Sequence, residues 1–208
     1  MSDSPASDSP VEGPVDQSRR TWVAITCGAG AIGGVAAAVP FVSTFMPSER
    51  AKAAGAAVEA DISALKPGEK MTVEWRGKPV WIIRRTKEQL ETLRKTESQV
   101  ADPKSLRNPA ELTPAYARNE YRSIKPEFMV AVGICSHLGC SPVDKLTPGA
   151  QPSLPDDWQG GFLCPCHGST FDLAGRVFKN KPAPDNLEVP PHKYLSDTTL
   201  LIGEDNKA

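Results

Sequence analysis

The chain has little of several features that would point to a function at once. It carries 24 basic and 25 acidic side chains in 208 residues, so its net charge is −1. Nucleic-acid binding needs a basic face or stripe, and no basic patch stands out, so we expect no nucleic-acid partner. Histidine occurs only three times and cysteine five times. The length leaves room for one domain and some appendages.

Charged residues are absent from one long stretch, residues 21–46. A helix of this length would span about 39 Å, more than the roughly 30 Å of a bilayer core. A cleaved signal peptide would have a shorter apolar region and a small-residue cleavage site. We therefore predict an uncleaved transmembrane anchor, with a buried helix of a soluble domain as the alternative. Arg19 and Arg20 stand directly before the stretch.

This anchor divides the chain into parts. Residues 1–20 are rich in Ser, Pro and Asp and have few large apolar groups to bury, which predicts a disordered tail. Residues 47–60 are rich in alanine but too short for a stable helix in water, and we interpret them as a linker. Residues 61–208 then form the head domain.

Strand-type patterns dominate the head. Two runs rich in β-forming side chains, residues 71–75 and 79–84, flank a turn and indicate a hairpin. A short helix is expected at 87–96 and a long, proline-punctuated loop at 98–127. Further strands are expected at residues 128–134 and 161–163, around Val177, and at 187–189 and 198–202. The predicted fold class is mostly antiparallel β, a sandwich or small barrel, with an inserted tip at about 128–185.

Four of the five cysteines and two of the three histidines fall in two short segments. Residues 135–140 read Cys-Ser-His-Leu-Gly-Cys, and residues 164–169 read Cys-Pro-Cys-His-Gly-Ser. Zinc would use four of these groups in a closed tetrahedron. A 2Fe–2S centre of mixed ligation needs two cysteines on one iron and two histidines on the other. Buried structural cysteines are a third interpretation, and the spacing alone leaves the choice of ligands open.

The two motifs resemble those of the Rieske iron–sulfur proteins, and the resemblance extends from about Arg19 to the C-terminus. It implies one 2Fe–2S cluster and a Rieske-type sandwich with a cluster-binding tip. The residues that the resemblance assigns are Cys135 and Cys164 to the inner iron, His137 and His167 to the outer iron, and Cys140 with Cys166 to a disulfide.

The resemblance also implies roles for residues around the cluster. Ser169 matches a serine whose hydroxyl donates to a bridging sulfide. Phe171 stands where the family often has a tyrosine that donates to a ligand sulfur, and phenylalanine cannot donate. His192 lies beyond the motifs and is expected in a surface loop. The remaining neighbours are Leu138 beside Gly139 as an apolar cap, and Pro182 and Pro184 in a rigid proline loop at residues 181–184.

The resemblance implies that the head lies outside the cytoplasm. A disulfide implies an oxidising compartment. Arg19 and Arg20 resemble the signal of an export route that carries folded, cofactor-loaded domains. The expected topology is a single-pass anchor in a bacterial inner membrane, with a cytoplasmic N-terminus, a hinge at residues 47–60 and a periplasmic head.

Residues 77–86 resemble in particular the Rieske subunits of cytochrome bc complexes, the ubiquinol–cytochrome c reductases. This implies that the head accepts one electron and one proton from ubiquinol at a cytochrome b subunit. It would pass the electron to a membrane-bound cytochrome c and so support proton translocation. His137 or His167 would hydrogen-bond the quinol, and contact with membrane lipid and a dimeric complex are expected.

Three other classes of protein compete with this interpretation. The main alternative is the small Rieske subunit of a periplasmic oxidase such as arsenite oxidase. A soluble Rieske ferredoxin fits poorly, because such proteins lack the disulfide cysteines and the anchor. A zinc-stabilised binding module is the alternative without redox chemistry.

Overall fold

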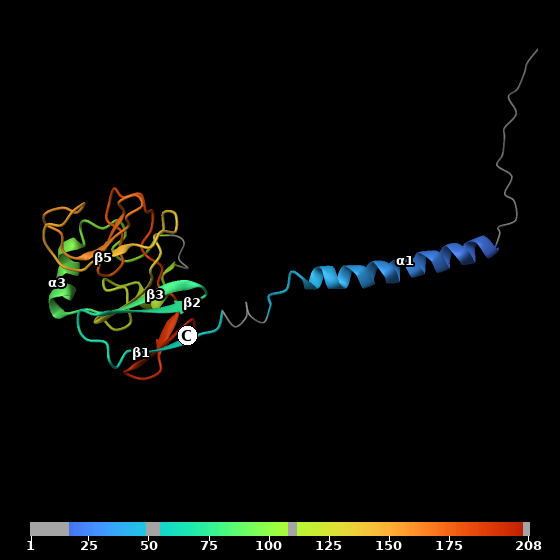
Figure 1. Ribbon diagram of the computed structural model, residues 1–208, viewed down its shortest axis with the longest axis horizontal. Helices are drawn as coiled ribbons and strands as arrows, with labels where there is room; N and C mark the ends of the chain where they lie inside the picture. The colour runs from blue at the N-terminus through green and yellow to red at the C-terminus, as the bar shows by residue number, and fades with distance from the viewer. Residues whose placement is uncertain (1–16, 49–54, 108–111, 206–208) are drawn as a thin grey trace, which may run out of the picture. The chain divides into compact units, whose positions relative to one another are not determined.

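The computed structural model describes residues 17–48, 55–107 and 112–205. The chain divides into two compact units, Met1–Arg50 and Ala51–Ala208. Among the described residues, the first unit is one helix, and the second is a head of short strands, loops and a short helix (Figure 1).

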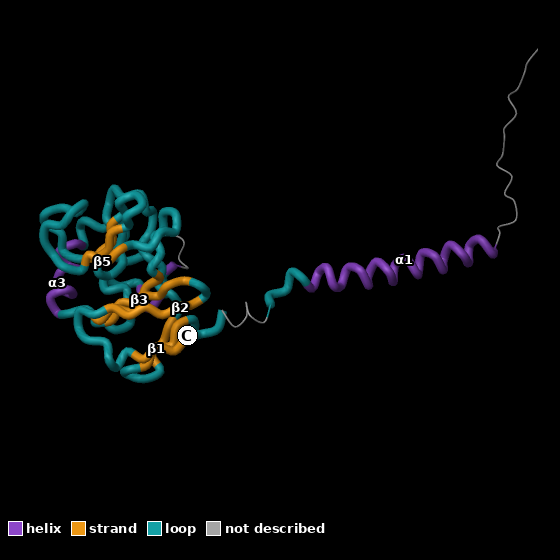
Figure 2. The backbone as a smooth tube through the Cα atoms, in the orientation of Figure 1, coloured by secondary structure: helices purple, strands orange, loops and turns teal. Residues whose placement is uncertain are grey.

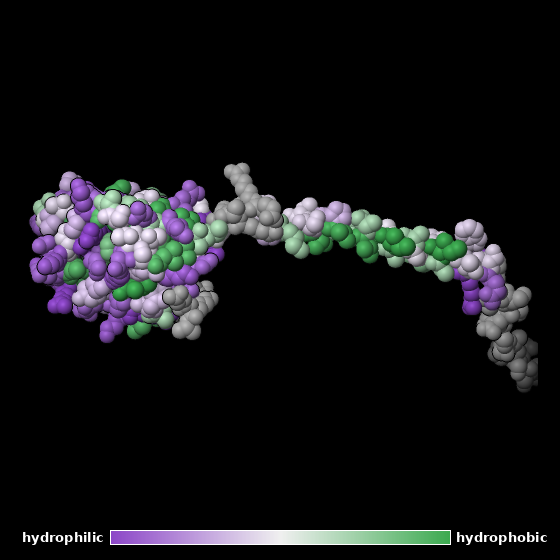
Figure 3. Space-filling view, turned by 90° about the horizontal axis from the view of Figure 1, so that it is seen from below, coloured by the Kyte–Doolittle hydropathy of each residue, from purple (hydrophilic) through white to green (hydrophobic). Residues whose placement is uncertain are grey.

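Helix α1 (Gln17–Ser43) is long and apolar enough to cross a membrane. Its side chains are exposed throughout, and Figure 3 shows apolar residues along most of its length. The helix begins four residues before the predicted stretch, so Arg19 and Arg20 belong to its first turn and not to a disordered tail. Residues 1–16 of that tail lie outside the described residues. The helix ends at Ser43, and residues 44–46, predicted as its end, form turns and a bend.

The described part of the head contains nine strands in three antiparallel sheets of three. The strand orders are β1-β9-β8, β2-β3-β4 and β5-β6-β7. This confirms the predicted class, mostly antiparallel β. The strands are β1 (Val58–Asp61), β2 (Lys70–Trp75), β3 (Lys78–Arg84), β4 (Phe128–Val132), β5 (Val143–Lys145), β6 (Gly161–Leu163), β7 (Thr170–Asp172), β8 (His192–Tyr194) and β9 (Thr199–Ile202).

The middle sheet, β2-β3-β4, separates two hydrophobic cores. Successive side chains of a strand point to opposite faces, and in β3 both faces are buried. Val80 and Ile82 belong to one core together with residues of β1 and β9. Trp81 and Ile83 belong to another core, which contains Cys135 and residues of β6 and β7. One face of this sheet therefore packs against the part of the head that contains the cysteine loops.

The hairpin and the helix were predicted correctly. β2 pairs with β3 in register from Lys70 opposite Ile83 to Trp75 opposite Lys78. Helix α3 (Lys87–Thr96) begins with a capping box, in which Thr86 accepts from the Gln89 N–H and the Gln89 side chain accepts from the Thr86 N–H. Such a box satisfies backbone donors that the first turn leaves free. Among its described residues, the predicted loop after it contains a short 3-10 helix, η2 (Ala115–Ala117), and an isolated bridge from Val100 to Phe178.

Several strand predictions were wrong or missing. Residues 187–189 are not a strand: Val132 donates to the Glu188 carbonyl, but no ladder forms. Val177 makes only an isolated bridge to Phe171. The last residues of the predicted linker, from Val58 onward, form β1 by pairing with β9. Figure 2 shows how much of the region around β5 is loop, which explains why its three-residue strands escape a search for alternation.

His192 was expected in a surface loop, and this expectation was wrong. It lies in β8 and its side chain is buried. Its Nδ1 donates to the Pro190 carbonyl at 2.8 Å, and its ring stands edge-on against that of Tyr116, 76 residues earlier in the chain. The local sequence does not show this contact because it is made by a distant segment.

Candidate metal centre

The two cysteine-containing loops share one backbone pattern. In residues 135–140, Cys135 N–H donates to the Cys140 carbonyl at 2.8 Å, and Gly139 N–H donates to the Cys135 carbonyl at 3.1 Å. In residues 164–169, Cys164 N–H donates to the Ser169 carbonyl at 2.7 Å, and the N–H of residue 168 donates to the Cys164 carbonyl at 3.0 Å. In each loop the backbone therefore turns back to bond its first cysteine. Cys135 follows β4 after two residues, and Cys164 follows β6 directly.

Glycine is needed in both loops for the same reason. Gly139 has φ +81° and Gly168 has φ +73°, in the left-handed region that other residues rarely adopt. A Cβ atom added at either position would meet nothing within 4 Å. The requirement is thus one of backbone conformation, since this conformation lets the fifth residue turn back to the first cysteine.

The loops bring the predicted iron ligands together, with the thiols inside and the imidazoles outside. Cys135 and Cys164 are each 2% exposed and share the second core. The rings of His137 and His167 lie 4.8 Å apart between centroids and nearly perpendicular. His137 is half-buried and His167 is exposed. This separation into a thiol pair and an imidazole pair is what a mixed-ligand two-iron centre requires.

The surroundings of Cys135 penalise its ionised form when no metal is bound. Burial raises the pKa of the Cys135 thiol, and the neighbouring Cys164 thiol adds to this. The backbone N–H of His137 and the hydroxyl of Ser169 act in the opposite direction. A bound cation would supply the missing stabilisation, because a coordinating thiol is held deprotonated by the metal.

The predicted disulfide is present: Cys140 and Cys166 are bonded, with Cα atoms 6.7 Å apart. It joins the end of one loop to the middle of the other. The Sγ atom of Cys164 lies within 4.8 Å of both bridged sulfur atoms. The bridge therefore fixes the two loops to each other immediately beside the thiol pair.

A third segment, the predicted proline loop with the following Asp185, contacts both loops. Ser169 Oγ accepts from the Ala183 N–H at 2.9 Å. Ser136 Oγ donates to the Asp185 carbonyl at 2.6 Å and accepts from the Asp185 N–H at 3.3 Å. Ser136 was not singled out from the sequence, although a hydroxyl beside a ligand cysteine is a signal that could have found it. Pro182 and Pro184 are exposed on either side of the buried Ala183.

The other predicted neighbours of the site lie on opposite sides of it. Leu138 is 71% exposed beside His137. It stands at the solvent side of the loop, as an apolar cap would. Phe171 is fully buried in β7, paired with Phe162 and in the same core as Cys135. The structure thus places a ring without a donor near the thiols.

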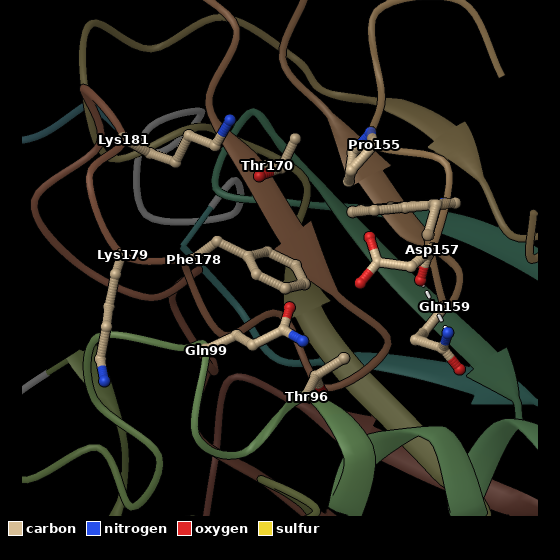
Figure 4. A pocket seen from close by; sticks show the side chains of 10 residues that line it. Thr96, Gln99, Pro155, Asp157, Gln159, Thr170, Phe178, Lys179 and Lys181 are labelled. Carbon is tan, nitrogen blue, oxygen red and sulfur yellow. Dashed lines mark hydrogen bonds between the residues drawn. The ribbon is translucent and has the colours of Figure 1, made fainter. Parts of the chain in front are cut away.

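A cleft of about 200 Å³ lies close to this region but does not include the centre. Figure 4 shows Phe178, Gln99 and Thr96 facing it. Thr170, which follows Ser169, also lines it. Neither the four predicted ligands nor the two disulfide cysteines line the cleft. The predicted chemistry therefore belongs to the loop tip and not to this cleft.

Two thiols and two imidazoles are a donor set that fits a 2Fe–2S cluster, and comparison with known proteins leads to the same cofactor. The Rieske [2Fe-2S] domain model matches residues 106–191, so the chain is a Rieske protein with a 2Fe–2S cluster as its cofactor. It is 56% identical over 187 residues to the ubiquinol-cytochrome c reductase iron-sulfur subunit of Allochromatium vinosum, covering 90% of this chain and 88% of that one. The corresponding protein of Rhodospirillum rubrum is 39% identical, covering 90% and 93%.

The chain belongs to the family of ubiquinol–cytochrome c reductase iron–sulfur subunits. A chain of a solved hyperthermophilic respiratory Complex III is 29% identical, covers 86% of this chain and 98% of that chain, and aligns with a TM-score of 0.44.

Proposed function

We propose that this chain is the Rieske subunit of a ubiquinol–cytochrome c reductase. It takes one electron and one proton from ubiquinol at a cytochrome b subunit and passes the electron to a membrane-bound cytochrome c, which supports proton translocation. The single observation that carries the proposal is the pair of imidazoles at the outer side of the tip, in a chain 56% identical to such a subunit.

Four residues are proposed as cluster ligands. Cys135 and Cys164 hold the inner iron, and His137 and His167 hold the outer iron. The cluster supplies a one-electron acceptor, and neutral imidazoles in place of thiolates raise its potential to somewhere between about −150 and +300 mV. The support is the burial of both thiols and the close approach of the two rings.

The imidazoles are also the proposed contact with substrate. One of them, His137 or His167, accepts the hydrogen bond of the quinol hydroxyl and takes up its proton. His167 is exposed and His137 is half-buried, so both are within reach of a molecule at the tip. Leu138 and the proline loop exclude water from the flanks of the thiol pair. Gly139 provides the left-handed backbone turn between Leu138 and the disulfide cysteine Cys140.

The proposed setting is a bacterial inner membrane. Residues 21–46 anchor the chain, residues 1–20 are cytoplasmic, residues 47–60 act as a hinge, and residues 61–208 form the periplasmic head. The apolar helix α1 and the Cys140–Cys166 bridge support an anchored protein with its head in an oxidising compartment. The complex around it is dimeric and contacts membrane lipid.

Metal analysis tests the ligand set. The full chain, purified in mild detergent, is expected to hold two irons and two acid-labile sulfides. Cys135→Ser and His137→Gln should each abolish both. Cys27→Ser is the matched control, because Cys27 is an exposed cysteine of α1 and its loss should leave the cluster intact. Stoichiometric zinc without sulfide would overturn the assignment.

Copurification tests the partners. Haem spectra and mass spectrometry of the same preparation should show a cytochrome b and a membrane-bound cytochrome c. A molybdenum-containing subunit in their place would instead support the small subunit of a periplasmic oxidase.

A further inference from the structure

Arg122 is a buried arginine whose side-chain hydrogen bonds go to neither of the two cysteine loops. Arg122 is 1% exposed and sits in the long segment between α3 and β4. Its guanidinium donates five hydrogen bonds, one for each of its five N–H groups. The acceptors are Ser105 Oγ at 2.7 Å, Thr113 Oγ1 at 2.8 Å, and the carbonyls of Ala174 at 3.0 Å, Gly175 at 3.2 Å and Leu187 at 2.6 Å.

This complete pairing distinguishes Arg122 from the two other buried arginines of the described chain. Arg85 has an unpartnered Nε, and Arg176 has an unpartnered terminal nitrogen. Burial lowers the pKa of Arg122 to about 10, so the group stays charged at neutral pH. Hydrogen bonds from a charged donor are roughly twice as strong as neutral ones.

One of these bonds reaches Leu187, three residues after the proline loop. The Leu187 carbonyl follows Asn186, and Asn186 is tied to the same network: its Nδ2 donates to Ser105 Oγ at 3.0 Å and to the Asp102 carbonyl at 2.9 Å. Ser105 Oγ therefore accepts from both Arg122 and Asn186. The chain directly after the proline loop, Asn186 and Leu187, is therefore held by Arg122, Ser105 and the Asp102 carbonyl.

The backbone is strained where this network is built. Arg122 has φ +48° and Ser105 has φ +54°, a region in which non-glycine residues with bulky side chains are outliers. Such conformations persist only where surrounding structure holds them, and they gather near functional sites. Both strained residues, Arg122 and Ser105, belong to the hydrogen-bond network that holds Asn186 and Leu187.

The near end of the proline loop connects the network to a thiol. Ala183 N–H donates to Ser169 Oγ at 2.9 Å, which leaves the serine proton free to point elsewhere. The Ser169 hydroxyl also acts to lower the pKa of the Cys135 thiol. A continuous path of contacts thus runs from Arg122 through Leu187 and the proline loop to Ser169.

We infer that Arg122 is a positioning residue of the metal centre: it fixes the proline loop so that the Ala183 N–H orients the Ser169 hydroxyl toward the cluster. The inference rests on the proposed ligand set. A hydroxyl that donates to a sulfur of the cluster stabilises the reduced, more negative cluster, so loss of its orientation disfavours reduction.

The test is the reduction potential of Arg122→Lys in the full chain in detergent. Lysine has three donors at one point and cannot replace a planar fork that spans five acceptors. We expect the equilibrium constant for cluster reduction to fall about threefold, which is ~30 mV lower for a one-electron couple at about 59 mV per tenfold. Thr113→Val removes one acceptor of the same network, and should shift the potential in the same direction if Arg122→Lys does not assemble.

Arg176→Lys is the matched control. Arg176 is fully buried, and its side-chain bonds go to Asp172 Oδ2, the Leu93 carbonyl and Thr96 Oγ1. None of these bonds reaches residues 181–187 or the segment that carries Arg122. Arg176→Lys should therefore lower the unfolding temperature as Arg122→Lys does but leave the potential unchanged. An equal shift of the potential in both variants would overturn the inference.

A second comparison uses Ser169→Ala as background. If Arg122 acts through Ser169, Arg122→Lys should cause no further fall in potential when the hydroxyl is absent. Additive shifts would contradict the inference. Iron and sulfide are counted in every sample: an unmutated chain without a cluster would refute the proposed function, whereas a full cluster with an unmoved potential would refute the role of Arg122 alone.

Discussion

The hydroxyl of Ser169 accepts a hydrogen bond of 2.9 Å from the backbone N–H of Ala183. This contact joins the second cysteine loop to the proline loop, which the sequence places 14 residues apart. Because the oxygen serves as acceptor there, its own proton is directed away from Ala183. The Cys135 thiol is the neighbour that this hydroxyl stabilises in its ionised form.

Removal of that hydroxyl should lower the reduction potential. In Ser169→Ala a sulfur of the cluster loses a donor, and a hydrogen bond to a charged group contributes about 1.5–3 kcal/mol. Only the difference between the two oxidation states counts, so we expect a fall on the order of tens of millivolts at about 59 mV per tenfold. Thr170→Val, which removes a buried hydroxyl one residue away, is the control and should leave the potential in place. A Ser169→Ala potential equal to that of the unmutated chain would refute the role of the hydroxyl.

Loss of the disulfide should leave the ligands in place but weaken the tip. The bridge closes a loop of 26 residues, and cross-links of this size stabilise a fold by about 3 kcal/mol. The Cys140→Ser, Cys166→Ser double variant should therefore lose its visible cluster absorbance at a lower temperature and assemble incompletely. Cys27→Ser provides the comparison, since Cys27 is unpaired. Equal thermal stability of the double variant and this control would argue against a stabilising bridge.

The residues that the sequence identified best are those whose type is dictated by chemistry. Thiols, imidazoles and the paired glycines can be read from two six-residue segments because no other side chains replace them. The hairpin of β2 and β3 was also found, since its strands are long runs of β-forming side chains joined by a tight turn. β5, β7 and β8 have three residues each, too few for any period to appear.

What the sequence did not show depends on contacts between distant segments. Arg122 and Leu187 are 65 residues apart, and Ser136 and Asp185 are 49 apart. No local pattern distinguishes a buried arginine with five acceptors from one in a solvated loop. The same holds for His192, which two preceding prolines placed in a surface loop but which Tyr116 helps to bury.

The burial of His192 should make the head less stable in acid. Desolvation lowers the pKa of His192 below its ordinary value of 6.5, so below that pH the unfolded chain binds the proton more readily than the folded one. Stability is therefore lost as the pH falls from 6.5 toward the folded pKa. In His192→Phe, the loss of unfolding free energy between pH 7 and pH 5 should shrink by about 1–2 kcal/mol.

Thermal unfolding of the full chain in detergent at the two pH values measures this effect. Tyr116→Phe is the control, because it removes the hydroxyl that accepts from the His192 N–H but keeps the imidazole. It should lower stability equally at both pH values. An unchanged acid sensitivity in His192→Phe would show that another group is responsible.

A tyrosine in place of Phe171 should raise the potential of the cluster. Phe171 is fully buried in the core that also holds Cys135 and Cys164, and its ring cannot donate a hydrogen bond. A hydrogen bond to a charged group contributes about 1.5–3 kcal/mol. A hydroxyl that donates to a ligand sulfur would stabilise the reduced cluster more than the oxidised one, and only this difference, a part of the bond energy, changes the potential. At about 59 mV per tenfold, Phe171→Tyr should raise the potential on the order of tens of millivolts. It should also speed quinol oxidation if electron transfer to the cluster limits that step.

Phe162→Tyr separates the hydrogen bond from the cost of burying a hydroxyl. Phe162 lies directly opposite Phe171 in the β6–β7 pair and is equally buried in the same core. Both variants add one oxygen to this core, and both should lower the unfolding temperature, because an unpartnered buried hydroxyl costs about 1–3 kcal/mol. Only the hydroxyl at position 171 should also raise the potential, since it alone stands where the family's donor does. A Phe171→Tyr chain with its hydroxyl beside a ligand sulfur and a potential no higher than that of Phe162→Tyr would refute this explanation of how the centre is tuned.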